Sequence, residues 1–272
     1  MTYKNIFVET SGSVLTVTLN RPEARNALNE AMLEELAQVF GSLGKRKSSR
    51  SNGSVVGVSP ASRVVVLKGA GLAFCAGADI KWMKRASEYS PAKNRRDAKR
   101  LLDMLGAVYE CSLPTIARVH GSVYGGALGV ISACDIVVAE EKTAFCFSEC
   151  RVGIIPAVVS TFVLPKIGPG HARRWFLTSD IFSASTAKEM GLIHQVAVES
   201  GLDRAVENLV GSILKNSPDA LKFTKEYVRK MQGLSHEARL AYSLGALVKT
   251  RSSAQAKEGF SAFIEKRPPV WS

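Results

Sequence analysis

The sequence predicts an α/β protein in which a mainly parallel sheet packs against helices and is followed by a helical C-terminal region. Short, continuous apolar runs recur through the earlier part of the chain, and helical patterns follow several of them. Repeated crossovers of this strand–strand–helix kind require a mainly parallel sheet. From about residue 184 onward the patterns are helical. With 272 residues, 46% of them hydrophobic, the chain can bury one large core.

The N-terminal segment predicts a hairpin and then a helix. Residues 4–19 alternate apolar and polar side chains, with a Ser-Gly turn between the two runs. Over residues 29–43 apolar side chains recur at helical spacing, and Asn29 is a suitable N-cap. Residues 44–62 are rich in Ser, Gly, Lys and Arg. Because so long a loop is unusual inside a compact domain, we expect a flexible insertion there.

The core is expected to resume after this insertion. Residues 64–67 form a continuous apolar run, typical of a strand that is covered on both faces. The pattern then predicts helices at 79–87 and 92–110, a strand at 115–119, a Gly-rich turn at 121–126, a helix that ends near Ala133, and a strand at 136–139.

The last part of the chain predicts helices alone, at 185–191, 202–215, 217–232, 235–249 and 253–264. No exact internal repeat is present. The sequence therefore predicts an α/β core over 1–195, which contains the insertion, and a C-terminal helical region over 196–272.

The formal net charge is +12. A positive field favours nucleic acid and also favours a ligand that carries several phosphates, so charge alone does not choose between them. The densest basic stretch, residues 44–50, has no interleaved aromatic residues that could stack on bases. A solvated loop is therefore the favoured interpretation, and nucleic-acid binding is not expected.

We expect a cytoplasmic protein without a metal site. The five cysteines lack the paired spacing of a zinc site, and most lie in apolar runs, so they are predicted to be reduced and structural. No run approaches the roughly 18 apolar residues that indicate a membrane span. The N-terminus lacks the apolar segment of a signal peptide.

Two segments of small residues, 74–80 and 120–129, each follow a predicted buried strand and lead into a helix. Small residues let a ligand approach the backbone closely, and the N–H groups at a helix start are free and partly positive. Either segment alone is explained by tight turns and close helix packing. Together they predict an oxyanion hole, in which two donors stabilise a developing negative charge on oxygen.

The chain resembles the crotonase superfamily, the enoyl-CoA hydratase/isomerase family, in several segments that occur in the family's order. The matching segments are 19–28, 75–83, 113–117, 120–129 with 133–136, 147–149 with 153–156, and 187–193. They extend over most of the chain, and residues 44–62 are the clear departure in length. The resemblance implies the crotonase-like (ClpP/crotonase) fold and an acyl-CoA thioester substrate. No fingerprint of another cofactor is present, so coenzyme A is expected to arrive as part of the substrate.

The resemblance also implies roles for individual residues. The N–H groups of Ala78 and Gly126 would hold the thioester oxygen, where charge develops when a proton leaves or joins the adjacent carbon. The residues implied in binding coenzyme A are Ala24, Arg25, Ala76, Asp79, Ile80, Phe263 and Lys266. Arg25 and Lys266 are equally well explained as ordinary surface cations. For the acyl pocket the candidates are Trp82, Met83, Tyr89, Tyr124 and Phe162, and core packing is at least as good an explanation of each.

Glu149 is the predicted acid–base residue. Its sequence neighbours are aromatic and aliphatic, and partial desolvation would raise its pKa and suit it to proton transfer. The alternative is a purely structural ion pair with Arg151 or Arg173.

Typical hydratases of the family carry a second glutamate, and Gly129 stands at that position here. Two hypotheses remain open. In the favoured one the protein is a hydratase in which Glu149 and other polar groups position water. Segments 147–149, 155–160 and 172–178 resemble bacterial enoyl-CoA hydratases close to the methylglutaconyl-CoA hydratases, and Lys81 or Arg118 could supply a cation for an acidic acyl group. In the other, Glu149 alone moves a proton between two carbons, as in the family's single-glutamate isomerases.

The resemblance further implies a homotrimer, or a hexamer of paired trimers, in which region 196–272 mediates trimerisation by exchange of C-terminal helices. Two other classes of function are a family member that binds RNA through the basic insertion and a catalytically silent acyl-CoA binder.

Overall fold

A six-stranded sheet forms the centre of the computed structural model, which describes residues 3–44 and 55–271. Its order is β1-β2-β3-β4-β6-β9, and every neighbouring pair except β1 and β2 runs parallel. The strands are β1 (Ile6–Ser11), β2 (Val14–Leu19), β3 (Val64–Gly69), β4 (Thr115–Val119), β6 (Ile136–Glu140) and β9 (Gln195–Ala197). The mainly parallel sheet and the opening hairpin are thus as predicted.

A second, smaller sheet has three strands and lies at the site described below. It consists of β5 (Ser122–Tyr124), β7 (Ala144–Cys146) and β8 (Phe182–Ser183). The chain passes from β4 to β5 in a sharp turn at Gly121, where φ is +62°. A Cβ atom on Gly121 would lie 2.1 Å from the carbonyl oxygen of Leu72, so only glycine fits this turn.

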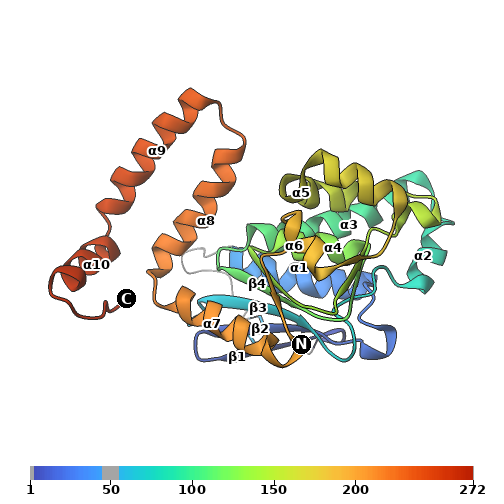
Figure 1. Cartoon of the computed structure of the whole chain (residues 1–272), viewed down its shortest axis with the longest axis horizontal. Helices are drawn as coiled ribbons and strands as arrows, with labels where there is room; N and C mark the ends of the chain where they lie inside the picture. Colours follow the sequence, from blue (N-terminus) through green and yellow to red (C-terminus); the bar gives the residue numbers. More distant parts are fainter. Residues whose placement is uncertain (1–2, 45–54, 272) are drawn as a thin grey trace.

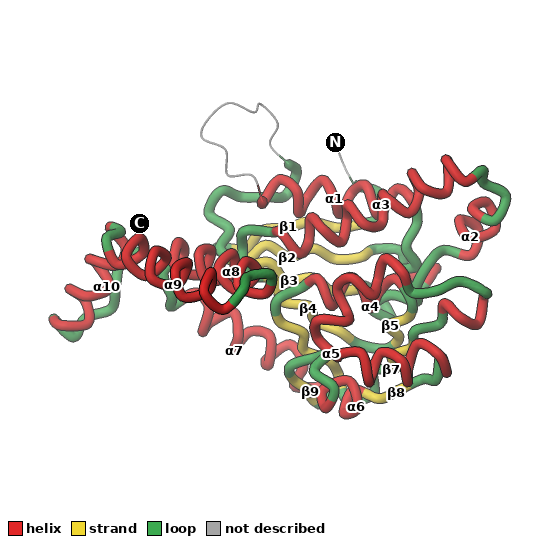
Figure 2. The backbone as a smooth tube through the Cα atoms, turned by 90° about the horizontal axis from the view of Figure 1, so that it is seen from above, coloured by secondary structure: helices red, strands yellow, loops and turns green. Residues whose placement is uncertain are grey.

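Helices cover both faces of the main sheet (Figures 1 and 2). On one face lie α1 (Glu30–Gly44), α3 (Pro91–Glu110), α4 (Gly126–Ala133) and α5 (Ala157–Thr178), each in contact with the next. On the other face α7 (Leu202–Leu214) packs against β3, β4 and β6. The short helices α2 (Ile80–Ala86) and α6 (Ala184–Glu189) complete the core, together with the 3-10 turns η1 (Pro22–Ala24), η2 (Glu149–Val152) and η3 (Glu199–Gly201).

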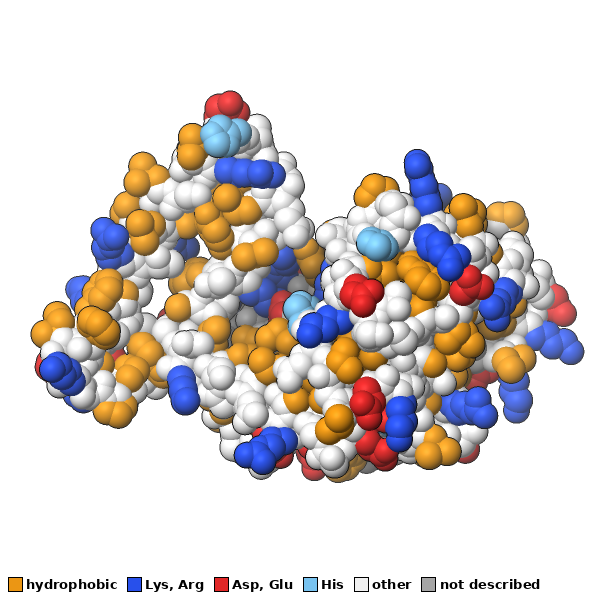
Figure 3. All heavy atoms as spheres, in the orientation of Figure 1, with side chains coloured by type: hydrophobic (Ala, Val, Ile, Leu, Met, Phe, Trp, Pro, Cys, Tyr) orange, Lys and Arg blue, Asp and Glu red, His pale blue; other side chains and the backbone are white. Residues whose placement is uncertain are grey.

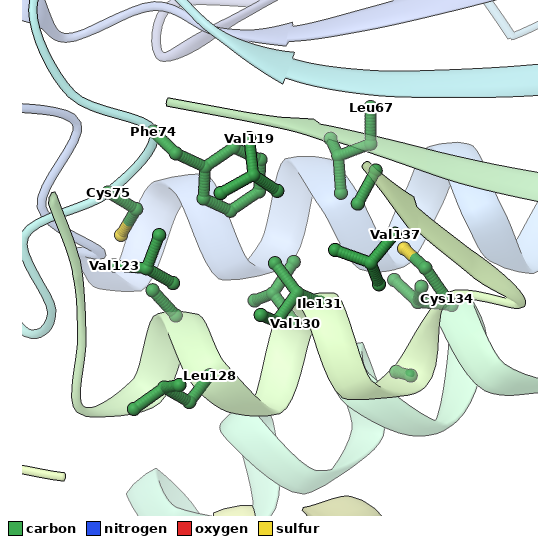
Figure 4. Packing of buried hydrophobic residues seen from close by; sticks show 14 of the residues in the cluster. Leu67, Phe74, Cys75, Val119, Val123, Leu128, Val130, Ile131, Cys134 and Val137 are labelled. Atoms are coloured by element: carbon green, nitrogen blue, oxygen red, sulfur yellow. The ribbon is translucent and has the colours of Figure 1, made fainter. Parts of the chain in front are cut away.

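Helix α4 lies inside the main hydrophobic cluster, and all its residues from Ala127 to Ala133 are buried. Figure 4 shows Val130 and Ile131 of this helix facing Val119 and Val137 of the sheet. Interiors packed in this way resist displacement. The N-terminal end of α4 is therefore held at a fixed place in the core.

The C-terminal helices α8 (Pro218–Gln232), α9 (His236–Arg251) and α10 (Ala254–Ile264) form an arm that extends away from the core (Figure 1). The arm is tied to the core near its base, where Lys225 Nζ lies 2.6 Å from Asp135 Oδ2 and donates to the Leu113 carbonyl oxygen at 3.1 Å. Among the described residues, no helix is both long and apolar enough to span a membrane.

The predicted helices agree with the structure to within a few residues, and Asn29 is confirmed as a cap because its Oδ1 accepts from Met32 N at 2.8 Å. Part of the predicted flexible insertion is packed instead of free. Thr10 Oγ1 donates to the Gly57 carbonyl oxygen at 2.7 Å, and Val55 and Val58 pack against the core. Residues 45–54, which hold most of the basic stretch, lie outside the described residues.

Helix α5 was not predicted. Its sequence contains Pro165 and Pro169, which normally interrupt a helix, and the chain bends at Gly168, where φ is 69° and ψ is 167°. The strands β5, β7, β8 and β9 were also missed, since each has only two or three residues and shows no usable alternation.

Candidate active site

The two small-residue segments lie side by side. Phe74 N donates to the His120 carbonyl oxygen at 2.8 Å, and Cys75 N donates to that of Ser122 at 3.1 Å. Tyr124 N in turn donates to the Cys75 carbonyl oxygen at 3.1 Å. The segment after β3 is therefore hydrogen-bonded along β5, and the two predicted halves of the site form one unit.

Each segment contains one of the two backbone N–H groups that were implied as oxyanion donors. The bonds from Leu28 N to Gly77 O (2.7 Å) and from Asp79 N to Leu28 O (2.8 Å) fix the chain on either side of Ala78. Neither the N–H of Ala78 nor that of Gly126, the first residue of α4, has a hydrogen-bond acceptor in the described part of the chain. Such free donors at the start of helices suit a developing negative charge.

Two glycines allow the backbones of the two small-residue segments to lie close together. Gly77 has φ of +100°, and a Cβ atom there would lie 3.1 Å from the Tyr124 carbonyl oxygen. Gly125 has φ of +49°, and its N–H donates to the Cys146 carbonyl oxygen at 2.9 Å. This hydrogen bond from Gly125 to Cys146 anchors the start of α4 on strand β7.

Glu149 is placed next to this pair of donors. A Cβ atom on Gly125 would lie 3.7 Å from Glu149 Oε1, so the carboxyl group packs against the residue that precedes Gly126. The residue is only 9% exposed, and within the described residues its Oε2 has no hydrogen-bond partner. Burial raises the pKa of Glu149 above its ordinary value, and a hydrogen bond from its own backbone opposes this only in part.

The alternative role for Glu149, an ion pair with Arg151 or Arg173, is not formed among the described residues. A buried carboxyl group without an ion-pair partner is costly, because burial disfavours its charged form. Such groups cluster at functional sites. The geometry therefore favours a chemical role for Glu149.

The three atoms nearest to where a side chain of residue 129 would start are all hydrocarbon atoms. A Cβ atom on Gly129 would lie 2.9 Å from Leu105 Cδ1 and 3.4 Å from Val159 Cγ2. Both neighbours are buried hydrophobic residues of α3 and α5. No sequence pattern indicated them, since both are far from Gly129 along the chain.

Most of the residues implied in binding coenzyme A are brought together. Ala76 N donates to the Arg25 carbonyl oxygen at 3.0 Å, which joins η1 and the residues after it to the segment before α2. Ala24 ends η1, and Ile80, 82% exposed, begins α2. Arg25 is exposed and has φ of 48°, so its side chain is free to meet a ligand.

Asp79 has a structural task in addition to any contact with a ligand. Its side chain caps α2 by accepting from the N–H groups of Lys81 and Trp82, and it forms an ion pair of 2.9 Å with Arg21. Burial alone would raise the pKa of Asp79. The hydrogen bonds from Arg21 and from the cap N–H groups outweigh burial and hold this pKa below its usual value. Arg21 was not predicted as part of the site, although it lies only four residues before Arg25.

Phe263 and Lys266 are not near these residues within one chain. Phe263 lies on α10 and is 84% exposed. Figures 1 and 2 show α10 and α2 at opposite ends of the molecule. If the two residues contact coenzyme A, the contact must come from a second copy of the chain.

The candidates for the acyl pocket have mixed positions. Trp82 is 7% exposed, and its Nε1 lies 3.1 Å from Asp97 Oδ2, which fixes it in the core. Phe162 packs edge to face on Tyr109, with ring centres 5.7 Å apart. The structure leaves Tyr124, Met83 and Tyr89 half-buried.

The two predicted cations differ in position. Arg118 is engaged by the Asp203 carboxylate in a polar cavity beside Lys68 and His120, so it is not available to an acyl group. Lys81 is exposed at the start of α2.

The fold thus places two backbone N–H groups that lack acceptors among the described residues next to the buried carboxyl group of Glu149. A family model described as enoyl-CoA hydratase/isomerase matches residues 9–272. The chain therefore belongs to the enoyl-CoA hydratase/isomerase family.

Individual relatives agree with this assignment. The chain is 31% identical to a short-chain-enoyl-CoA hydratase of Clostridium acetobutylicum over 98% of this chain and 97% of the relative. It is 28% identical to a crotonyl-CoA hydratase of Syntrophomonas wolfei over 98% of this chain and 97% of the relative. A solved enoyl-CoA hydratase structure from Shewanella pealeana superimposes with a TM-score of 0.90 at 31% identity, covering 99% of this chain and 96% of that one. The predicted crotonase-like fold is confirmed.

Proposed function

We propose that the protein is a hydratase that adds water to, or removes it from, a 2-enoyl-CoA thioester, with Glu149 as its acid–base residue. The observation that carries this proposal is the buried, unpaired Glu149 carboxyl group beside the free N–H groups of Ala78 and Gly126. The names of the relatives, several of them hydratases, support the choice of reaction.

The proposed chemistry uses these groups in order. The thioester oxygen accepts from the two N–H groups, which stabilise the enolate that forms when oxygen bonds to C3. Glu149 removes a proton from the attacking water, and the hydroxyl group bonds to C3. The protonated Glu149 then returns a proton to C2. The sum is one water added across the double bond, with coenzyme A entering and leaving as part of the substrate.

A second function, double-bond isomerisation, is favoured by the surroundings of Gly129. Leu105 and Val159 offer no hydrogen bond there, whereas an ordered water needs two to four polar partners. Without water, Glu149 would take a proton from C2 of a 3-enoyl-CoA and return it at C4. The same two N–H groups would stabilise the same kind of enolate.

A branched, acidic acyl group of the methylglutaconyl kind is a finer part of the proposal. It rests on the resemblance of segments 155–160 and 172–178 to hydratases of that kind. Of the two predicted cations only Lys81 remains as a candidate partner for an acyl carboxylate, because Asp203 engages Arg118. A cytoplasmic location and the absence of nucleic-acid binding also remain predictions.

The test is to incubate the protein with crotonyl-CoA, 3-hexenoyl-CoA and 3-methylglutaconyl-CoA separately. Absorbance of the conjugated thioester is followed and the products are identified by mass. A gain of one water on a conjugated substrate supports the hydratase, and new conjugation of 3-hexenoyl-CoA without a mass change supports the isomerase. Equal turnover by the parent and the Glu149→Gln variant would contradict the catalytic role of Glu149.

A further inference from the structure

The first turns of helix α4 have two different kinds of neighbour. At its start, the Glu149 carboxyl group lies against Gly125. One turn further along, Leu105 and Val159 lie against Gly129. Gly125 is the N-cap of α4, and Gly129 lies about one turn further along the helix. The carboxyl group and the hydrocarbon wall therefore contact α4 at positions about one turn apart.

The direction that a side chain at position 129 would take follows from helix geometry. Cα–Cβ bonds tilt toward the N-terminus of a helix, so a side chain covers the turn that precedes it. At position 129 it would extend toward Gly126 and the Glu149 carboxyl group. Leu105, fully buried and supplied by α3, takes up the start of that path, since its Cδ1 would be only 2.9 Å from the new Cβ.

Building on the proposed function, we propose that Leu105 is a specificity-determining residue of this site. Its side chain fills with hydrocarbon the space near Glu149 that a carboxyl group on residue 129 would otherwise reach. Leu105 offers no hydrogen bond to a water molecule at this place, which limits hydration relative to proton transfer between carbons. The same apolar wall selects enoyl-CoA substrates that carry alkyl substituents near the reacting carbons.

A double-mutant cycle on activity tests this proposal. Gly129→Glu alone is expected to give no gain in hydration of crotonyl-CoA, because Leu105 obstructs the new side chain. The double variant Gly129→Glu with Leu105→Ala is expected to hydrate crotonyl-CoA more readily relative to its isomerisation of 3-hexenoyl-CoA. The ratio of these two activities should be at least about tenfold higher than in either single variant. This gain is smaller than the contribution of an evolved acid–base group. Met104→Ala with Gly129→Glu is the matched control. Met104 is as buried and lies on the same helix, but it is not among the atoms nearest Gly129.

A second cycle, read by thermal unfolding, needs no turnover. Alanine normally stabilises a helix relative to glycine, but Gly129→Ala should lower the unfolding midpoint of the parent because of the contact with Leu105. In the Leu105→Ala background the same change should be neutral or raise the midpoint. An equal decrease in both backgrounds would overturn the proposal, as would Gly129→Glu alone matching the double variant. Failure of the proposed function itself would be recognised separately, because turnover by the parent protein would then not depend on Glu149.

Discussion

At the scale of single residues, the buried Glu149 carboxyl group lowers the stability of the folded protein when it is charged. Its Oε2 has no partner among the described residues, and burial raises its pKa. The folded protein therefore holds this proton more tightly than the unfolded chain, whose value is the ordinary one of about 4.5. The contribution of Glu149 to the free energy of unfolding thus falls as pH rises from that value through the raised pKa.

Glu149→Gln should therefore separate function from stability. We expect turnover to fall by about 10²-fold to 10⁴-fold, as for the loss of a general acid–base group. Thermal stability at pH 8 should stay the same or rise, because the variant removes a buried, unpaired charge. The parent's turnover should also decrease as pH falls through the raised pKa, since a base must be deprotonated. A variant that loses stability and keeps its turnover would contradict the proposed role.

We expect turnover to require glycine at position 125, because a side chain there would disturb the site. Its φ is +49°, and a Cβ atom would lie 3.4 Å from Ser148 Oγ and 3.7 Å from Glu149 Oε1. Gly125→Ala should lower turnover by about 10-fold to 100-fold, because small displacements of a catalytic group are costly. Gly12 has a similar φ of +56° and no atom within 4 Å of its Cβ position. Gly12→Ala therefore carries the same backbone strain and should lower the unfolding midpoint without changing turnover.

At the scale of elements, helix α2 depends on Asp79, which caps it and binds Arg21. Ala78, whose N–H is a proposed oxyanion donor, directly precedes this cap. We expect Asp79→Ala to cost about 1 kcal/mol of stability through the lost cap and to lower kcat more than it raises KM for the acyl-CoA. Ser235→Ala, which removes the cap of α9, is the control and should leave kcat unchanged. A change in KM alone would indicate instead that Asp79 mainly contacts coenzyme A.

Sequence patterns predicted the elements with a clear period and missed those set by tertiary contacts. The hairpin of β1 and β2 and the helices from α6 to α10 follow from apolar spacing, and Asn29 acts as the cap that its side chain suggests. Helix α5 was missed because Pro165 and Pro169 interrupt a pattern that only packing on α4 stabilises.

The candidate site was predictable where backbone chemistry defines it. The two segments of small residues that lead into helices are a local signal, and the family resemblance implied Ala78 and Gly126 within them. The contact of Leu105 with Gly129 was not predictable, because it depends on how α3 crosses α4. The separation of Phe263 from α2 likewise depends on the direction in which the arm leaves the core.

At the scale of the whole molecule, the C-terminal arm exposes more apolar surface than a monomer requires. Helices α8 and α9 bury none of their residues, and Figure 3 shows hydrophobic side chains gathered over the arm. A groove of about 540 Å³ between α8 and α10 is lined in part by Phe223, Phe260 and Trp271. Large exposed apolar patches mark interfaces. We therefore propose that the arm packs on other copies of the chain, in the trimer or hexamer that the sequence analysis predicts.

Light scattering during size exclusion should give a mass three or six times 29.3 kDa, corresponding to a trimer or a hexamer. Phe263→Ser on the arm should shift the protein toward smaller species and weaken binding of coenzyme A in parallel, because Phe263 can meet the candidate residues near α2 only from a second copy. Leu177→Ser, a comparably exposed leucine on α5, is the control and should change neither property. A parent protein that elutes as a monomer and still binds coenzyme A tightly would contradict both the assembly and the contribution of Phe263 from a neighbouring copy.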